Sequence, residues 1–228
     1  NETQYIMAFV GNSKRDTARH LKQVQIAANQ LHMTRLENLN TIGDYKEVAV
    51  KMVQGDFENL FTGGTFQEIA TNLGIATRYS APYSHAQNGR IEQAWYLLLV
   101  ITIGLVNYAG MDPSTPLWRY AFYNAVHIWN NTVHTREPTR RSPYELVTGK
   151  QPDLSLERVW GCPAYFVNPR DSKLEPNGRV RTNLGRDYST KDGYYILDER
   201  SNKVITRRDV TFKVSMKVGK RENISKDL

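Results

Sequence analysis

Two acidic residues, Asp56 and Glu92, stand where their carboxylates could do chemistry together. Asp56 follows an apolar run over 48–53 that predicts a strand, and Glu92 opens a long apolar segment that predicts a helix. Carboxylates at a strand end and a helix start can share divalent metal ions through hard oxygen ligands. Two such ions beside a phosphate favour in-line displacement by water or a 3′-hydroxyl. Among 23 acidic residues this spacing also arises by chance, so two surface carboxylates are the alternative.

The net charge of +7 lies entirely in the second part of the chain. Residues 1–130 carry ten basic and ten acidic side chains, whereas residues 131–228 carry 20 basic and 13 acidic ones. A basic segment behind a neutral one fits a polyanion partner, most simply nucleic acid. A solvated basic surface that maintains solubility is the alternative.

Cysteine content and hydropathy exclude several classes of protein. The single cysteine, Cys162, excludes an internal disulfide, and the five histidines lack ligand spacing, so we expect no zinc in this chain. The first residues have neither the basic nor the apolar region of a secretion signal, and a start at Asn1 suggests a fragment. The apolar segment 91–106 is short for a bilayer, so we expect a buried helix and no membrane.

Strands and helices are expected to alternate through the first 130 residues. Short apolar runs predict strands over 5–10, 48–53 and 75–80. Apolar residues at helical spacing predict helices over about 19–39, 66–73, 91–106 and 118–129. Gly74 stands where a helix would end in the left-handed conformation. The alternation indicates an α/β layer architecture.

The pattern changes after the Pro- and Arg-rich stretch over 136–143, which predicts a boundary. Beyond it, short aromatic and β-branched runs alternate with turn residues, which is typical of a small all-β module. These runs cover 159–160, 164–167, 193–197, 203–205 and 210–212. Tyr194 and Tyr195 are candidate nucleic-acid contacts, although strand alternation predicts that at least one of them packs in the core.

The residues around Glu92 resemble a known family. The stretch Ser80-Ala81-Pro82-Tyr83, followed by the turn Asn88-Gly89, is similar to the segment before the last catalytic glutamate in integrases of copia-type (Pseudoviridae) long-terminal-repeat retrotransposons. The distance from Asp56 to Glu92 matches the family's spacing between its second and third acidic residues. Further landmarks follow in order over 117–131, 142–152, 159–165, 172–176, 192–194 and 207–212.

The resemblance implies an α/β fold built on a ribonuclease H-like integrase core. That core would cover residues 1–110 and be incomplete at its amino terminus. A helical extension and linker would follow over 111–155, then a small β-rich basic module over 156–215 and a polar tail over 216–228. An SH3-like barrel is one option for the module.

The resemblance also implies a function, which is to insert element DNA into host DNA by two-metal polynucleotidyl transfer. Asp56 and Glu92 would be catalytic ligands of Mg²⁺ or Mn²⁺. The expected partners are the element ends, the target DNA and further copies of the chain, in the nucleus with a cytoplasmic virus-like particle stage. The residues expected to contact DNA are Asn88, Gly89, Arg90, Arg207 and Arg208.

Two departures from the family pattern predict impaired catalysis. The family's first catalytic aspartate lies upstream of the segment that matches 5–10, so we expect this chain to lack it. After Glu92 the family has a polar, basic helix along DNA, whereas 93–101 here is apolar. The alternative function is therefore a non-catalytic, integrase-derived protein that binds nucleic acid or a partner. A hydrolytic nuclease of the same superfamily ranks third, because the segments after the core match integrases.

Overall fold

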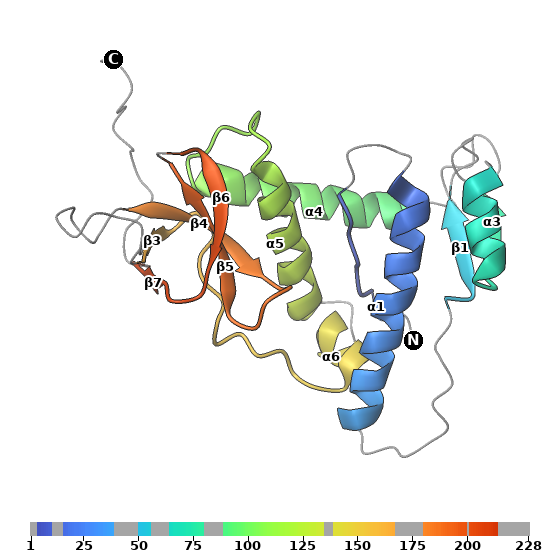
Figure 1. The fold of residues 1–228 in the computed structure, drawn as a ribbon. Helices are drawn as coiled ribbons and strands as arrows, with labels where there is room; N and C mark the ends of the chain where they lie inside the picture. The colour runs from blue at the N-terminus through green and yellow to red at the C-terminus, as the bar shows by residue number, and fades with distance from the viewer. Residues whose placement is uncertain are drawn as a thin grey trace. The chain divides into compact units, whose positions relative to one another are not determined.

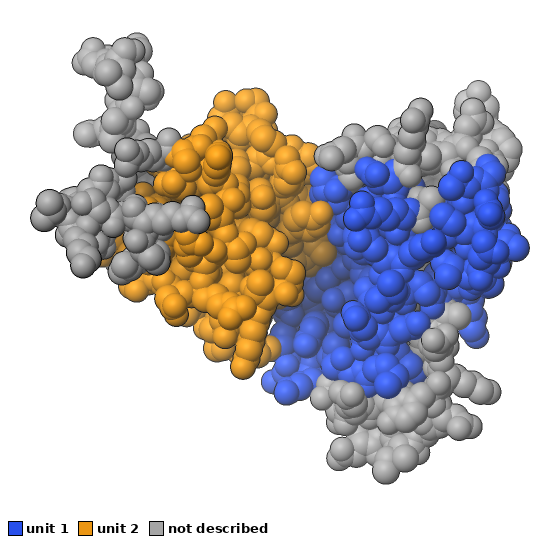
Figure 2. Space-filling model, viewed as in Figure 1, with its two compact units in different colours: residues 1–96, 128–152 blue, residues 97–127, 153–228 orange. Residues whose placement is uncertain are grey.

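The structure is a computed structural model that describes residues 4–10, 16–38, 50–55, 64–79, 89–134, 139–166, 180–199 and 201–213. The chain divides into two compact units (Figure 2). Unit 1 comprises residues 1–96 and 128–152, and unit 2 comprises residues 97–127 and 153–228. The domain boundaries expected at 110, 155 and 215 stay predictions.

Unit 1 contains a parallel strand pair and the helices beside it (Figure 1). Strands β1 (Met52–Gly55) and β2 (Ala76–Tyr79) are joined in sequence through α3 (Gly64–Asn72), as parallel neighbours require a crossover. Helix α1 (Thr17–Asn38) packs against α3. The sequence predicted these four elements, with β1 a few residues earlier. The core of this layer consists of Leu21, Phe66, Ala70 and Ile75.

Helix α3 ends through Gly74, as the sequence predicted. Gly74 has a φ of +67°, a left-handed conformation that a residue without a β-carbon adopts at little cost. Its amide donates to the Thr71 carbonyl at 3.0 Å, and the Ile75 amide donates to the Ala70 carbonyl at 2.8 Å. These bonds satisfy the last carbonyls of the helix and lead the chain directly into β2.

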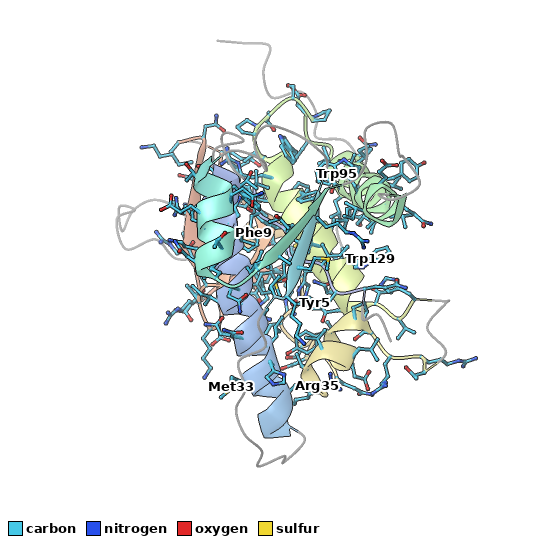
Figure 3. The ribbon with its side chains drawn as sticks, turned by 90° about the vertical axis from the view of Figure 1, so that its right-hand side faces the viewer. Tyr5, Phe9, Met33, Arg35, Trp95 and Trp129 are labelled. Atoms are coloured by element: carbon cyan, nitrogen blue, oxygen red, sulfur yellow. The ribbon has the colours of Figure 1, made fainter. Side chains whose placement is uncertain are left out.

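The strand predicted over 5–10 is wrong, because residues 4–10 have no strand pairing in the structure. The side-chain amide of Asn130 takes the place of a neighbouring strand. Its Nδ2 donates to the Ile6 carbonyl at 2.8 Å, and the Ile6 amide donates to its Oδ1 at 2.9 Å. Beside it, Trp129 Nε1 donates to the Gln4 carbonyl at 3.1 Å (Figure 3 labels Trp129). Backbone groups of this extended segment are therefore satisfied by side chains.

Helix α6 (Pro143–Thr148) is fixed by its own local sequence. Ser142 Oγ accepts a hydrogen bond from the Glu145 amide at 3.2 Å, which caps the amino end, and proline at the first position has the required φ. Gly149, with a φ of +75°, ends the helix and donates to the Glu145 carbonyl at 2.8 Å. Helix α6 packs against α1 in unit 1.

Helices α4 (Gly89–Tyr108) and α5 (Trp118–Asn131) form where the sequence predicted helices, but α4 is not the buried helix that we expected. Its buried side chains, Leu98, Thr102 and Val106, lie on one face only. Over 91–108, α4 is long and apolar enough to cross a membrane by length and composition alone, and only 17% of that window is buried. Tryptophan, tyrosine, valine and isoleucine side chains on α4 are instead exposed.

Unit 2 contains a five-stranded antiparallel sheet with the order β6-β5-β4-β3-β7. The strands are β3 (Pro163–Tyr165), β4 (Arg181–Asp187), β5 (Gly193–Asp198), β6 (Lys203–Arg207) and β7 (Thr211–Phe212). All but β4 were predicted, whereas the run at 159–160 is not a strand. Two clusters form the core, one around Trp160 with residues of α4 and α5, the other around Phe166 and Ile196.

Gly161 lets the chain approach α4 closely in unit 2. It has a φ of +80°, and a β-carbon at this position would collide with Ala109 near the end of α4. Its amide donates to the Asn183 carbonyl at 2.8 Å, which ties the turn to β4. Both the conformation and the space therefore require glycine at this position.

Strand β4 escaped prediction because its sequence is polar, yet six of its seven residues are buried. Asn183 Nδ2 donates to the Val159 carbonyl at 3.0 Å, and its Oδ1 accepts the Gly185 amide at 3.1 Å. A buried polar side chain is tolerated when such bonds replace those to water. The register shifts between Asn183 and Arg186, where Gly185 has a φ of +98°.

Candidate functional site

The first of the two predicted carboxylates, Asp56, comes directly after a strand of the parallel pair. Gly55 at the end of β1 is paired with Tyr79 at the end of β2, so both strands leave the sheet at the same edge. Asp56 follows Gly55 in sequence but lies outside the described residues, as does Asn88. Glu92 lies in the first turn of α4, the next described element after β2.

Glu92 is the one of the two predicted carboxylates that the structure describes. It is exposed, and the amino end of a helix stabilises negative charge. Among the described residues, no group of three or more His, Cys, Asp and Glu side chains could hold a metal ion. Because a divalent cation needs several oxygen ligands, Glu92 requires Asp56 or another carboxylate beside it. The metal-binding roles of both residues stay predictions.

The residues predicted to meet DNA near Glu92 begin the same helix. Gly89 is the first residue of α4 and is exposed, with no atom within 4 Å of the place where a β-carbon would stand. This open space is compatible with close approach by a ligand. Arg90 follows it in the helical backbone. Their contacts with DNA stay predictions.

The face of α4 beyond Glu92 carries no cation for a phosphate. Residues 93–111, all of them described, include no charged side chain. Tyr96 is 65% exposed, Val100 48% and Ile103 56%. An exposed apolar face of this kind is typical of a partner-binding surface rather than a nucleic-acid surface.

Some of the basic side chains of the β-rich module contact other side chains of the module. In the described residues between 156 and 213 there are eight basic and six acidic side chains, so the basic excess is small here. The guanidinium of Arg181 lies 4.2 Å from the centre of the Phe166 ring, and its Nε lies 3.6 Å from Asp198 Oδ1. Arg207 approaches the same ring at 5.2 Å. Arg208, the other predicted DNA contact of the module, is exposed.

A charged cluster in unit 2 was missed by sequence reasoning. Oε1 of Glu157 lies 3.1 Å from His127 Nε2 of α5 and 3.4 Å from an Arg186 nitrogen of β4. The Tyr188 ring stacks on His127 with 4.6 Å between ring centres. Burial acts to raise the pKa of Glu157, but hydrogen bonds and charges from His127 and Arg186 outweigh it and lower that pKa. No motif could have revealed this cluster, because its members are far apart in sequence.

The two adjacent tyrosines of β5 both direct their hydroxyls into the protein. Tyr194 is buried and donates to the Leu156 carbonyl at 2.7 Å, which confirms the expectation that at least one of the two packs in the core. Tyr195 donates to Asp187 Oδ1 at 2.9 Å, and burial together with this carboxylate raises the pKa of Tyr195 to about 12. Thr206 also donates to Asp187, at 3.2 Å. This buried carboxylate therefore joins β4, β5 and β6.

Comparison with known proteins places the module and relates the chain to transposon polyproteins. The family model of the retroviral polymerase SH3-like domain matches residues 162–226. The Retrovirus-related Pol polyprotein from transposon RE1 of Arabidopsis thaliana is 30% identical over 156 residues, which is 66% of this chain and 10% of that protein. The corresponding polyprotein from transposon TNT 1-94 of Nicotiana tabacum is 23% identical over 171 residues, which is 73% of this chain and 12% of that protein.

The chain thus spans about a tenth of the length of these curated relatives. Its carboxyl-terminal module is of the SH3-like type, which confirms the option raised from the sequence, and the chain is related to a segment of transposon Pol polyproteins. Among solved structures, the catalytic core domain of BIV integrase is 19% identical with a TM-score of 0.39, covering 63% of this chain and 76% of that chain. A chain of the simian T-cell lymphotropic virus intasome is 15% identical with a TM-score of 0.37, covering 68% of this chain and 54% of that chain.

Proposed function

We propose that the chain is the integrase region of a copia-type retrotransposon Pol polyprotein, with a ribonuclease H-like core ahead of its SH3-like module. The observation that carries this proposal is the similarity of two thirds of the chain to transposon Pol polyproteins. The parallel pairing of β1 with β2 ahead of α4 supports it, because Asp56 directly follows β1 and Glu92 lies in the first turn of α4, the places that the integrase resemblance implies for the second and third acidic residues.

In this proposal the chain takes part in joining element DNA to host DNA. Asp56 and Glu92 hold Mg²⁺ or Mn²⁺, which when bound would activate the attacking oxygen and stabilise the leaving oxygen. Copies of the chain assemble on the element ends and the target DNA in the nucleus, after a cytoplasmic virus-like particle stage. The DNA contacts come from Asn88, Gly89, Arg90, Arg207 and Arg208.

The uncharged face of α4 makes us expect impaired activity. A helix along DNA normally offers cations to the phosphates, and here residues 93–111 offer none. We therefore expect slow joining that needs Mn²⁺ and high concentrations of DNA.

The test is strand transfer and nicking on labelled duplex oligonucleotides with Mn²⁺. The whole chain is compared with Asp56→Asn and Glu92→Gln, and with Glu68→Gln as a matched control, because Glu68 is an exposed glutamate on α3. The proposal expects products from the wild type and the control, and a loss of about 100-fold or more in the other two variants. Products that persist in Glu92→Gln, or none from the wild type, refute catalysis by this site.

A non-catalytic, integrase-derived protein that binds nucleic acid or a partner is the second candidate function, and the exposed uncharged face of α4 favours it over catalysis because that face offers no cation to a phosphate. This candidate predicts DNA binding without joining. The affinity should fall steeply with salt, and Arg208→Gln should reduce the slope of log K against log salt by about one. Binding without salt dependence contradicts it.

A further inference from the structure

The five-stranded sheet of unit 2 carries a different apolar cluster on each of its faces, because successive side chains of a strand point to opposite sides. One cluster surrounds Trp160 and includes residues of α4 and α5. The other, which we call the Phe166 face, consists of Ala164, Phe166, Tyr194 and Ile196, with Phe212 packed against them. All of these residues belong to unit 2, so the Phe166 face is built within one unit.

Three arginines lie beside the rings of the Phe166 face. The guanidinium carbon of Arg181 is 4.2 Å from the centre of the Phe166 ring, and that of Arg207 is 5.2 Å from the same ring. The guanidinium carbon of Arg158 is 5.7 Å from the centre of the Phe212 ring. At such distances the electrons of a ring attract a cation and restrain the side chain that carries it.

Tyr194 links two of these contacts. It stands opposite Arg207 in the pairing of β5 with β6, and opposite residues share a face and lie close together. Its ring also meets the Phe212 ring edge-on, with 4.7 Å between ring centres. Arg158, beside Phe212, and Arg207 therefore flank the same tyrosine.

The three arginines differ in how their charge is balanced. Arg181 is buried, and its Nε lies 3.6 Å from Asp198 Oδ1, so its charge is balanced within the protein. Arg158 and Arg207 are half-buried and donate to backbone carbonyls. In the described part of the chain, no carboxylate oxygen lies within 4.0 Å of either guanidinium. A ring has no net charge, so both arginines keep a positive charge that an outside anion can use.

We propose that Arg158 and Arg207 bind phosphates of a nucleic-acid backbone, and that Phe212 and Phe166 are positioning residues that hold these arginines ready. The proposal rests on the proposed function, in which the chain binds DNA, and it names the face of the module that does so. A guanidinium is a planar fork of N–H donors that matches phosphate oxygens. Ordering a long side chain weakens binding, and a ring that already restrains the side chain reduces this cost.

The surrounding charge favours nucleic acid over an acidic protein as the partner. Residues 131–228 carry 20 basic and 13 acidic side chains, and a backbone with one charge per nucleotide suits such an excess. Two further cations, Arg208 and Lys213, are exposed near these strands. Lys213 also lies beside a ring, with its Nζ 5.8 Å from the centre of the Tyr165 ring.

The test measures binding of the whole chain to a fluorescein-labelled duplex of about 20 base pairs by fluorescence anisotropy. Arg207→Gln should reduce the slope of log K against log salt by about 0.9, because one phosphate contact is lost. Phe166→Leu keeps every charge, so it should leave the slope unchanged and weaken binding by about 2- to 10-fold. Arg208 is the matched control, because it is the next residue, is exposed, and has no described ring beside it.

Double-mutant cycles separate positioning from a general loss of structure. Phe166→Leu should have no further effect on affinity in an Arg207→Gln background, but should keep its full effect in an Arg208→Gln background. A variant that merely loses its fold weakens binding equally in both backgrounds. By the same reasoning, Phe212→Leu should be coupled to Arg158→Gln and not to Arg208→Gln.

Several results overturn the proposal. Equal effects of Phe166→Leu in the two backgrounds refute positioning by the ring, as does an unchanged affinity. DNA binding that Arg207→Gln does not alter refutes the site but leaves the proposed function intact, whereas a wild type that binds no DNA at low salt contradicts both. Tighter binding of poly-glutamate than of DNA assigns the arginines to an acidic protein partner, which also overturns the proposal.

Discussion

The carboxylate of Glu157 should make the stability of unit 2 sensitive to acid. Its Oε1 lies 3.1 Å from His127 Nε2 and 3.4 Å from Arg186, and the side chains of Glu157 and Arg186 are 23% and 16% exposed. Glu157→Gln keeps the shape and an accepting oxygen but removes the charge. The bonds to His127 and Arg186 then lose their anionic acceptor, and the partly buried Arg186 guanidinium loses this counter-charge. We expect a loss of about 1–2 kcal/mol at pH 7.

The sign of the pH dependence follows from the lowered pKa of Glu157. Burial opposes ionisation, but His127 and Arg186 outweigh it, so the folded pKa lies below that of the unfolded chain. The stabilisation is therefore complete above the unfolded value of about 4.3 and is lost as pH falls through the folded pKa. The difference between wild type and Glu157→Gln should be present at pH 7 and absent once Glu157 is protonated.

The measurement is amide hydrogen exchange by mass spectrometry. Exchange rates of peptides from β4 and β5 report the local stability of unit 2. At pH 7 the variant should exchange about 5- to 30-fold faster than the wild type. The difference should become smaller as pH falls toward 2.5, because Glu157 is progressively protonated, and comparison at each single pH cancels intrinsic chemistry. Asp209→Asn, which removes an exposed carboxylate from the same unit, should match the wild type at both values. Equal loss at pH 7 and pH 2.5 refutes the charge argument.

Three further substitutions test packing in unit 2 and hydrogen bonding in unit 1. Gly161→Ala should lower the free energy of unfolding by about 2–4 kcal/mol, because φ is +80° and the β-carbon meets Ala109. Gly185→Ala, with a φ of +98° but no neighbour closer than 3.5 Å, should cost about 1–2 kcal/mol, and equal losses in urea melts would contradict the role of Ala109. Asn130→Ala removes both bonds to Ile6 and should speed exchange of that amide by about tenfold, whereas an unchanged rate would show that Asn130 does not hold the segment.

Periodicity predicted the helices because their apolar residues recur at the helical interval and their ends carry recognisable signals. Gly74 marks the end of α3, whereas α6, which Ser142 and Gly149 cap, was not predicted. The same reasoning did not predict strand β4, because its residues are mostly polar. Hydrogen bonds within the protein, such as that from Asn183 to the Val159 carbonyl, make the burial of these polar groups possible. The apolar run over 5–10 predicted a strand that did not form. The side chain of Asn130, instead of a neighbouring strand, bonds the backbone of Ile6.

Glu92 lies at the start of a helix, as predicted, but the helix that follows it is not buried as expected. Apolar composition predicts burial, and only packing decides which face of α4 is covered. The Glu157 cluster joins residues from α5, a loop and β4, so it exists only in the folded chain. Sequence reasoning also did not predict that Arg207, expected to contact DNA, lies beside the ring of Phe166.

Mn²⁺ binding in the absence of DNA tests directly whether Asp56 and Glu92 together hold a divalent metal ion. Electron paramagnetic resonance measures free Mn²⁺ during titration of the whole chain, with Glu68→Gln as the control. We expect Mn²⁺ to bind the wild type and the control, and to bind both Asp56→Asn and Glu92→Gln at least about tenfold more weakly. A wild type that binds no Mn²⁺, or a titration that neither substitution changes, contradicts it.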